Sequence, residues 1–229
     1  MVVKVLLVDS DASAAGLAAH LREQGVDVKQ VDQGSSALAL HGSADAILLA
    51  LKLPDADGFH MCQTIRLQST IPILTVADRN DEFDHVLALK MGADDYIVKP
   101  YRYREVSARL EAVIRRIRNY SSDALPMADI LRSGRSKCIG NVMIDMENHR
   151  VTVDGREIKL TSTEFDLFAL LARDPGCTLT RADIMTEIWG REDAQGSRAL
   201  GVHMANVRRK IGKPGLIKTV RGIGFRLAG

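Results

Sequence analysis

Five short apolar segments, each followed by a segment of helical character, constrain the fold of this chain more than any other feature. The apolar segments read KVLLVD, VDVKQVD, DAILLAL, IPILTVA and DDYIVKP. The first, third and fourth show no polar alternation, which is expected of strands that are buried on both faces. Because strands that alternate with helices pair in parallel, the pattern predicts an α/β domain with a doubly wound, parallel five-stranded sheet.

The helical segments of this half are ASAAGLAAHLREQG, GSSALALHG, GFHMCQTIRLQ, EFDHVLALKMG and REVSARLEAVIRRIRNY. Gly25, Gly42 and Gly92 stand where such helices ordinarily stop. We expect this first domain to span residues 1–120. Residues 121–136 are polar and lack periodicity, so they are predicted to form a linker.

Residues 137–229 follow a different pattern. The segment NVMIDMENHRVTVDGREIKLT reads as a run of short strands with a hairpin turn at Asp154-Gly155. Thr161 and Glu164 have the spacing of a capping box, which predicts the start of a helix over EFDLFALLARDPG. Two further helices, TRADIMTEIWG and SRALGVHMANVRRKIG, precede a closing hairpin, IKTVRGIGFRLA. Three helices followed by a two-stranded wing predict a winged helix-turn-helix domain.

The net charge of +2 conceals an uneven distribution. Residues 1–120 hold 14 Lys and Arg against 16 Asp and Glu, whereas residues 136–229 hold 15 against 11. No acidic residue follows Asp193, and the eight basic residues beyond it are Arg198, Arg208, Arg209, Lys210, Lys213, Lys218, Arg221 and Arg226. A solvated basic surface is the simpler explanation, but so long an acid-free segment favours nucleic-acid binding.

The last predicted helix of this domain has two distinct faces. At about 100° per residue, one face gathers Leu200, Met204, Val207 and Ile211, which are expected in the core. The opposite face carries two arginines, an asparagine and small apolar residues, which can read guanine, adenine and thymine methyl groups in a major groove. An ordinary basic surface helix is the alternative. The residues predicted to contact DNA are Arg198, Val202, His203, Ala205, Asn206, Arg208, Arg209, Lys210 and, from the hairpin, Arg221.

Other residue types exclude several classes of protein. The three cysteines, Cys62, Cys138 and Cys177, are dispersed, which favours reduced thiols in the cytoplasm over a disulfide framework. The histidines show no metal-ligand spacing, and no apolar run approaches the roughly 18–20 residues of a transmembrane helix. With no Ser/His/Asp set or phosphate-binding glycine loop, we expect a cytoplasmic protein that is not an enzyme and uses no metal or cofactor. Trp189 is expected in the core rather than against a base.

The carboxyl ends of parallel strands are where a functional site is expected in such a sheet. The residues at these ends are Asp9, Ser10, Asp11, Ala50, Ala77 and Lys99. The third strand therefore ends in the methyl group of Ala50, where a reactive side chain would be expected.

The whole chain resembles bacterial response regulators of the OmpR/PhoB family. The motifs that carry the resemblance are LLVDSD, LPDADG, GADDYIVKPY, LTSTEFDLFALL, SRALGVHMANVRRKIG and IKTVRGIGF. The resemblance implies a flavodoxin-like receiver domain and a winged-helix domain that regulates transcription, with double-stranded promoter DNA and RNA polymerase as partners. It also implies a phosphoryl-accepting aspartate after the third strand, an acidic pair that holds Mg²⁺, and a hydroxyl group and a lysine that engage the phosphate.

Three positions depart from the family pattern. The acceptor position is Ala50, Ser10 replaces the second acid of the pair, and an alignment without gaps places Ala77 rather than Thr75 at the hydroxyl position. A methyl group can neither attack phosphorus nor ligate magnesium, which needs several oxygen ligands. One alanine could be an engineered substitution, but three departures predict a regulator that works without phosphorylation.

We therefore expect a receiver pocket that is fixed in one state. Lys99, with no acceptor carboxylate beside it, is expected to pair with Asp9 or Asp11. Asp55 and Asp57 fit the loop that the family normally carries beyond the acceptor, so they are not expected to replace it. Two alternatives remain: the altered pocket binds a small-molecule ligand that gates DNA binding, or the receiver docks a protein partner.

The resemblance also implies a dimer surface made of the fourth helix, the fifth strand and the fifth helix. The expected cross-subunit pairs are His85 with Glu105, Asp95 with Arg109, Asp94 with Arg116, and Lys90 with Glu111. In the last pair the charges are exchanged relative to the family, in which the acid lies on the fourth helix. A concerted exchange predicts a constitutive homodimer, although two reversals could coincide by chance. Such a dimer is expected to bind two DNA repeats one helical turn, about 10 bp, apart.

Overall fold

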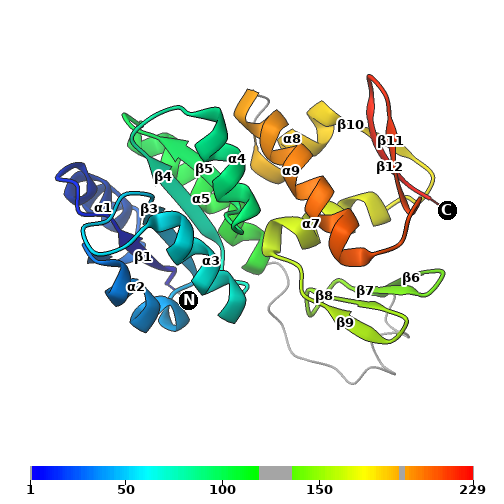
Figure 1. The fold of residues 1–229 in the computed structure, drawn as a ribbon, viewed down its shortest axis with the longest axis horizontal. Helices are drawn as coiled ribbons and strands as arrows, with labels where there is room; N and C mark the ends of the chain where they lie inside the picture. The colour runs from blue at the N-terminus through cyan, green and yellow to red at the C-terminus, as the bar shows by residue number, and fades with distance from the viewer. Residues whose placement is uncertain (1, 119–135, 191–193, 229) are drawn as a thin grey trace. The chain divides into compact units, whose positions relative to one another are not determined.

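The computed structural model describes residues 2–118, 136–190 and 194–228, and the chain divides into two compact units, residues 1–114 and 115–229 (Figure 1). The first unit ends shortly before the boundary predicted at residue 120. Of the expected linker, residues 121–135 lie outside the described residues. The two units are described one at a time.

The first unit contains the predicted parallel sheet, with strand order β2-β1-β3-β4-β5. Its strands are β1 Lys4–Val8, β2 Asp27–Val31, β3 Ala46–Ala50, β4 Ile73–Ala77 and β5 Asp95–Val98. Every residue of β3 and β4 is buried, in agreement with the lack of polar alternation in their sequences. The chain changes direction across the sheet between β1 and β3, which is where such folds place their sites.

Five α-helices flank this sheet within the described residues. They are α1 Ser13–Glu23, α2 Gly34–Leu40, α3 Gly58–Gln68, α4 Glu82–Lys90 and α5 Tyr103–Arg118, with a short 3-10 helix, η1 His41–Ser43, after α2. Apolar side chains of α1 and α5 pack with Leu48 and Leu74 of the sheet in one continuous core. Helices α2, α3 and α4 cover the other face, and α3 contacts both α2 and α4. A doubly wound α/β domain is therefore confirmed.

Among its described residues, the second unit combines two small sheets with three helices (Figure 1). Its antiparallel four-stranded sheet consists of β6 Ser136–Ile139, β7 Val142–Asp145, β8 Arg150–Val153 and β9 Arg156–Ile158. The helices are α7 Ser162–Ala172, α8 Arg181–Trp189 and α9 Ala194–Ile211. The second sheet has the order β10-β12-β11, with β10 Thr178–Thr180, β11 Ile217–Val220 and β12 Gly224–Leu227. This arrangement confirms the predicted winged helix-turn-helix fold.

Local signals in the sequence account for the element boundaries of this unit. The Thr161 hydroxyl accepts from the Glu164 backbone N–H, and the Glu164 carboxylate accepts from the Thr161 N–H, so the predicted capping box is present. Asp154 and Gly155 have φ values of 51° and 76°, as the predicted hairpin between β8 and β9 requires. Strands β6 and β10 were not predicted. A Cβ atom at Gly224 would lie 1.9 Å from the Leu179 carbonyl oxygen, so the pairing of β10 with β12 depends on a glycine.

None of the helices in the described ranges is both long enough and apolar enough to cross a membrane.

Candidate functional sites

The residues predicted for the receiver pocket converge on one edge of the parallel sheet. Asp9 directly follows β1, Ala50 ends β3 and Ala77 ends β4, and each is less than 5% exposed. Lys99 follows β5, and its backbone N–H donates to the Ala77 carbonyl oxygen at 2.8 Å. The start of α3 closes over β3, because a Cβ atom at Gly58 would lie 2.4 Å from the Ala50 carbonyl oxygen. Ala50 is therefore buried at the end of β3, beneath the start of α3.

The Lys99 ammonium is the centre of charge in this pocket. Its Nζ atom lies 2.8 Å from Asp9 Oδ2, 3.9 Å from Asp11 Oδ2 and 3.7 Å from Asp78 Oδ1. Burial by itself lowers the pKa of Lys99, but the hydrogen bond and charge of Asp9, together with the charge of Asp11, raise that pKa above its usual value. The pairing with Asp9 agrees with the sequence-based expectation. Asp78 was not predicted, because it lies one residue beyond the end of β4 and outside the motifs of the family.

The aspartates of the loop after β1 also form hydrogen bonds with the backbone of that loop. Asp9 Oδ1 accepts from the Asp11 N–H at 3.0 Å, and Asp11 Oδ1 accepts from the Ser13 N–H at 2.7 Å. Hydrogen bonds from the side chain and backbone of Ser13, together with the charge of Lys99, lower the pKa of the exposed Asp11 carboxyl group. Ser10 is exposed in the same loop. One oxygen of each aspartate is thus used by the loop, and the other faces Lys99.

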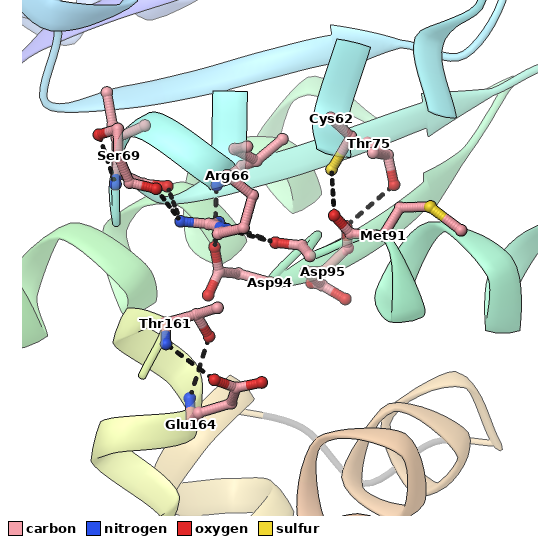
Figure 2. Close-up of polar contacts among 12 residues, drawn as sticks. Cys62, Arg66, Ser69, Thr75, Met91, Asp94, Asp95, Thr161 and Glu164 are labelled. Carbon is pink, nitrogen blue, oxygen red and sulfur yellow. Dashed lines mark hydrogen bonds and ion pairs between the residues drawn. The ribbon is translucent and has the colours of Figure 1, made fainter. Parts of the chain in front are cut away.

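Three nearby polar residues have structural roles. The Thr75 hydroxyl is fully buried and donates to the Asp95 carbonyl oxygen at 3.2 Å (Figure 2), which supports the placement of Ala77 at the pocket position. Asp57 caps α3 by accepting from the Phe59 and His60 N–H groups. Asp55 accepts from the first N–H groups of α2, and these bonds lower its pKa. Asp55 and Asp57 therefore serve as helix caps.

The magnesium ion that the fold family implies does not fit the residues of this pocket. A hard divalent cation needs several oxygen ligands. Ala50 offers none, and the remaining oxygen of Asp9 forms an ion pair with the Lys99 ammonium. Among the described residues, no group of three or more His, Cys, Asp or Glu side chains is arranged to hold a metal ion.

A cavity of about 720 Å³ opens beside Lys99. It is lined by Asp11, Ser13, Asp78, Lys99, Pro100, Tyr101, Arg102 and Tyr103. The rings of Tyr101 and Tyr103 lie 6.4 Å apart, so the cavity has aromatic walls as well as charged groups. Its volume is within the range of small-molecule sites.

The predicted nucleic-acid interface lies on α9 and the wing. Leu200, Met204, Val207 and Ile211 are at most 3% exposed, which confirms the core face, and Trp189 is in the core at 4%. Ala205 and Arg209 are exposed, whereas Arg198, Val202 and Asn206 are half-buried. Arg221 is exposed on the turn between β11 and β12. The residues that helical geometry placed opposite the core are thus partly or fully accessible to solvent, and so is Arg221 on the wing.

Two of the predicted DNA contacts, His203 and Lys210, have other partners in the structure. His203 is 1% exposed, and its ring centroid lies 5.9 Å from that of Trp189. Its side chain is therefore in the core, and its prediction as a DNA contact is wrong. The Lys210 ammonium lies 2.5 Å from Glu164 Oε2, at the start of α7. Sequence periodicity could not separate these roles, because His203 and Lys210 flank the core face of α9.

Arg208 joins α9 to the wing. Its Nε donates to the Ile217 carbonyl oxygen at 3.1 Å, and its Nη2 donates to Thr219 Oγ1 at 2.7 Å. Its guanidinium lies 5.5 Å from the Phe225 ring, and the Arg181 guanidinium lies 5.4 Å from the same ring. Partial burial lowers the pKa of Arg208. Arg208 thus helps to fix the position of the wing relative to α9.

The surface predicted for dimerisation is organised differently from the expectation. His85 is fully buried and stacks on Tyr96 with ring centroids 4.6 Å apart. Asp94 is also fully buried and pairs with Arg66 of the same chain at 2.9 Å (Figure 2). These two side chains would have to leave their sites to reach a second subunit, so they are removed from the predicted surface.

The other predicted interface residues divide into two groups. Arg109 is 6% exposed and pairs within the chain with Asp95, at 3.2 Å, and with Glu105. Lys90 and Glu111 are exposed. The side chain of Arg116 lies outside the described residues.

Comparison with known proteins identifies both units. Residues 5–111 match the model of the response regulator receiver domain, and residues 155–227 match that of the C-terminal domain of transcriptional regulatory proteins. The chain is 38% identical to the sensory transduction protein RegX3 of Mycolicibacterium smegmatis, over 98% of this chain and 99% of that protein. It is 36% identical to the DNA-binding response regulator MtrA of Mycolicibacterium paratuberculosis, with 97% of each chain covered.

Solved structures show the same architecture. A structure of a RitR mutant superimposes with a TM-score of 0.74 at 26% identity, covering 99% of this chain and 100% of the other. Taken together, the sheet, the wing and the matches define a DNA-binding response regulator that regulates transcription. The chain belongs to the OmpR/PhoB family.

Proposed function

We propose that this regulator binds its DNA sites without aspartyl phosphorylation. The observation that carries the proposal is the 2.8 Å contact between Lys99 and Asp9, in a pocket whose acceptor position is the buried Ala50. In this arrangement the pocket contains no carboxylate at the acceptor position, and its lysine and first acid neutralise each other. The receiver is then held in one state by its own side chains, and DNA binding depends on the concentration of the protein.

A DNA-binding assay with a phosphodonor tests this proposal. Binding sites are first selected from random DNA with the full chain, and affinity is then measured with and without acetyl phosphate and Mg²⁺. We expect the two affinities to be equal. A response regulator that retains its acceptor aspartate serves as the positive control for the donor. A donor-dependent rise in affinity, accompanied by a phosphorylated protein, would contradict the proposal.

DNA recognition is proposed to use two grooves. Arg209 and Asn206, with Val202 and Ala205, face the major groove from α9, where their side chains suit base edges and methyl groups. Arg221 reaches the adjacent minor groove, where a narrow A·T tract attracts arginine. Both groups are accessible in the structure, which supports this division.

We further propose that the chain is a constitutive homodimer through α4, β5 and α5. The burial of His85 and Asp94 restricts the proposed contacts to exposed residues, chiefly Lys90 and Glu111. Lys90→Glu places two acids opposite each other and weakens the dimer, and adding Glu111→Lys restores it. Analytical ultracentrifugation of the two variants is the test. A single variant that dimerises like the wild type would remove this pair from the interface.

A regulator gated by a small-molecule ligand is the second candidate function. The cavity of about 720 Å³ beside Lys99, with Tyr101 and Tyr103 in its wall, favours it. A thermal-shift screen of metabolites separates the two candidates: a compound that stabilises the wild type and changes its DNA affinity supports gating. If that effect disappears in a Tyr101→Ala variant that remains folded, the compound acts through this cavity.

A further inference from the structure

Three carboxylates from separate loops surround one ammonium group in the receiver pocket. Asp9 and Asp11 come from the loop after β1, and Asp78 directly follows β4. All three lie within 4 Å of Lys99 Nζ. Asp78 is the member that the family motifs did not single out, and it adds a third negative charge beside Lys99.

The hydrogen bonds of these carboxylates explain why they point at Lys99. Asp9 Oδ1 and Asp11 Oδ1 accept backbone N–H groups, so the Oδ2 atom of each is left to face the ammonium. Asp78 Oδ2 lies 3.2 Å from the Lys52 ammonium, and its Oδ1 faces Lys99. Each carboxylate thus directs one oxygen toward the same nitrogen atom.

The buried Asp9 carboxylate requires a cation beside it, whereas Asp11 and Asp78 are partly exposed to water. Asp9 is buried, with a side chain 2% exposed, and the Lys99 side chain is 15% exposed, so their attraction is screened little by water. Lys52 is different, because its side chain is 71% exposed and it reaches Asp78 from the outside. Loss of the Lys99 ammonium would leave three carboxylates with an oxygen within 4 Å of the vacated position. These carboxylates are not arranged as a metal site while Lys99 is present, but a small movement of the Asp11 and Asp78 side chains would bring oxygen ligands to a hard divalent cation.

We propose that Lys99 is a built-in cation: its ammonium takes the place of a divalent metal ion inside a cage formed by Asp9, Asp11 and Asp78. The pocket is then occupied by its own chain and excludes divalent cations. This inference rests on the proposed phosphorylation-independent function, for which it supplies the physical reason. It also assigns Asp78 a role in the pocket, as the third carboxylate of the cage.

Titration with Mn²⁺ tests the cage in the full chain, with free Mn²⁺ followed by electron paramagnetic resonance. We expect Lys99→Met to bind Mn²⁺ at least ~10-fold more tightly than the wild type, because removal of the ammonium frees the three oxygens. Adding Asp78→Asn to Lys99→Met removes most of that gain. Lys52→Met is the matched control, because it removes a lysine from the same cluster without opening its centre, and it is expected to bind Mn²⁺ like the wild type.

Each other outcome has a defined meaning. Equal Mn²⁺ binding by the wild type and Lys99→Met overturns the proposal. The proposal is also overturned if Lys52→Met gains as much Mn²⁺ affinity as Lys99→Met. If Lys99→Met does not fold, Lys99→Gln replaces it, since glutamine removes the charge but keeps a hydrogen-bond donor. Should neither fold alone, recovery of folding by Mn²⁺ supports the cage and absence of recovery overturns it.

The Mn²⁺ titration uses neither DNA nor a phosphodonor. A failed cage is therefore distinguished from a failure of the proposed function, which is detected by the effect of acetyl phosphate on DNA affinity.

Discussion

On α9, Arg209 is exposed whereas His203, also predicted to contact DNA, is packed beside Trp189. A rotation of 100° per residue correctly placed the core residues and the residues opposite them. It could not decide the positions at the margin of the core face, because these depend on which neighbour fills the space. At the scale of single residues, base recognition is therefore best tested at Arg209.

Arg209→Ala should reduce discrimination at one base pair by roughly 1–3 kcal/mol, because a bidentate arginine–guanine contact would be lost. Competition binding with a set of operators substituted at single positions measures this effect. Lys218→Ala is the control, since Lys218 is an exposed cation on β11 and is not among the α9 residues proposed to contact bases. The control should weaken binding by a similar factor on every sequence. Uniform weakening by Arg209→Ala as well would make Arg209 a phosphate contact.

The thiols provide a prediction based on pKa. Burial raises the pKa of Cys62 to about 12, whereas Cys138 and Cys177 are exposed. Because the thiolate is the reactive form, Cys62 should not react at pH 8 in the folded protein. Titration with a chromophoric disulfide reagent should detect the two exposed thiols in buffer and the third after unfolding. Rapid reaction of Cys62 in the native protein would show that α3 opens readily.

At the scale of secondary-structure elements, Arg66 connects α3 to the start of β5. Its guanidinium donates to the carbonyl oxygens of Ser69, Ile71 and Gly92 and pairs with the fully buried Asp94 (Figure 2). Asp94 also accepts from the Ile73 N–H at 2.9 Å, at the start of β4. This one ion pair therefore holds together the ends of three neighbouring elements.

Asp94→Ala should lower the free energy of unfolding by about 3–5 kcal/mol, because it leaves the Arg66 guanidinium without its buried counter-ion. Glu187→Ala is the control: it breaks the Arg173–Glu187 pair, whose side chains are 62% and 49% exposed, and should cost less than about 1 kcal/mol. Urea unfolding of both variants gives the comparison. A small effect of Asp94→Ala on stability, together with a weakened dimer, would instead favour the cross-subunit role expected from the sequence.

Most elements were predictable because their signals are local. The apolar strands, the capping box of Thr161 and Glu164, and the Asp154-Gly155 turn depend on neighbouring residues, and all were found. Strands β6 and β10 have three or four residues each, which is too short for a periodic pattern. Strand β6 pairs with the neighbouring β7, whereas β10 pairs with β12, which is distant in the sequence. The same reason explains why Asp78 and the true partners of Asp94 were missed. These are contacts between loops and helices that only the folded chain brings together.

At the scale of the whole molecule, the two units have separate tasks that the charge distribution reflects. The first unit has 16 acidic residues within positions 1–120, and its pocket is neutralised internally. The second unit concentrates eight cations after Asp193. The proposed function has no phosphorylation step to control pairing, so it makes the spacing of DNA repeats the main condition under which two chains bind together.

Inserting about 5 bp between two repeats spaced one helical turn apart should therefore weaken binding by the wild type, because it rotates the second repeat to the opposite side of the duplex. Lys90→Glu, which is expected to weaken the dimer, should bind the original operator less tightly and should respond little to the insertion. The Lys90→Glu/Glu111→Lys variant should regain both the affinity and the sensitivity to spacing. Gel-shift titrations with the two operators, at one salt concentration, measure all three proteins. Equal binding of the wild type to both operators would mean that the chains occupy the repeats independently, and the constitutive dimer would then have no role in DNA recognition.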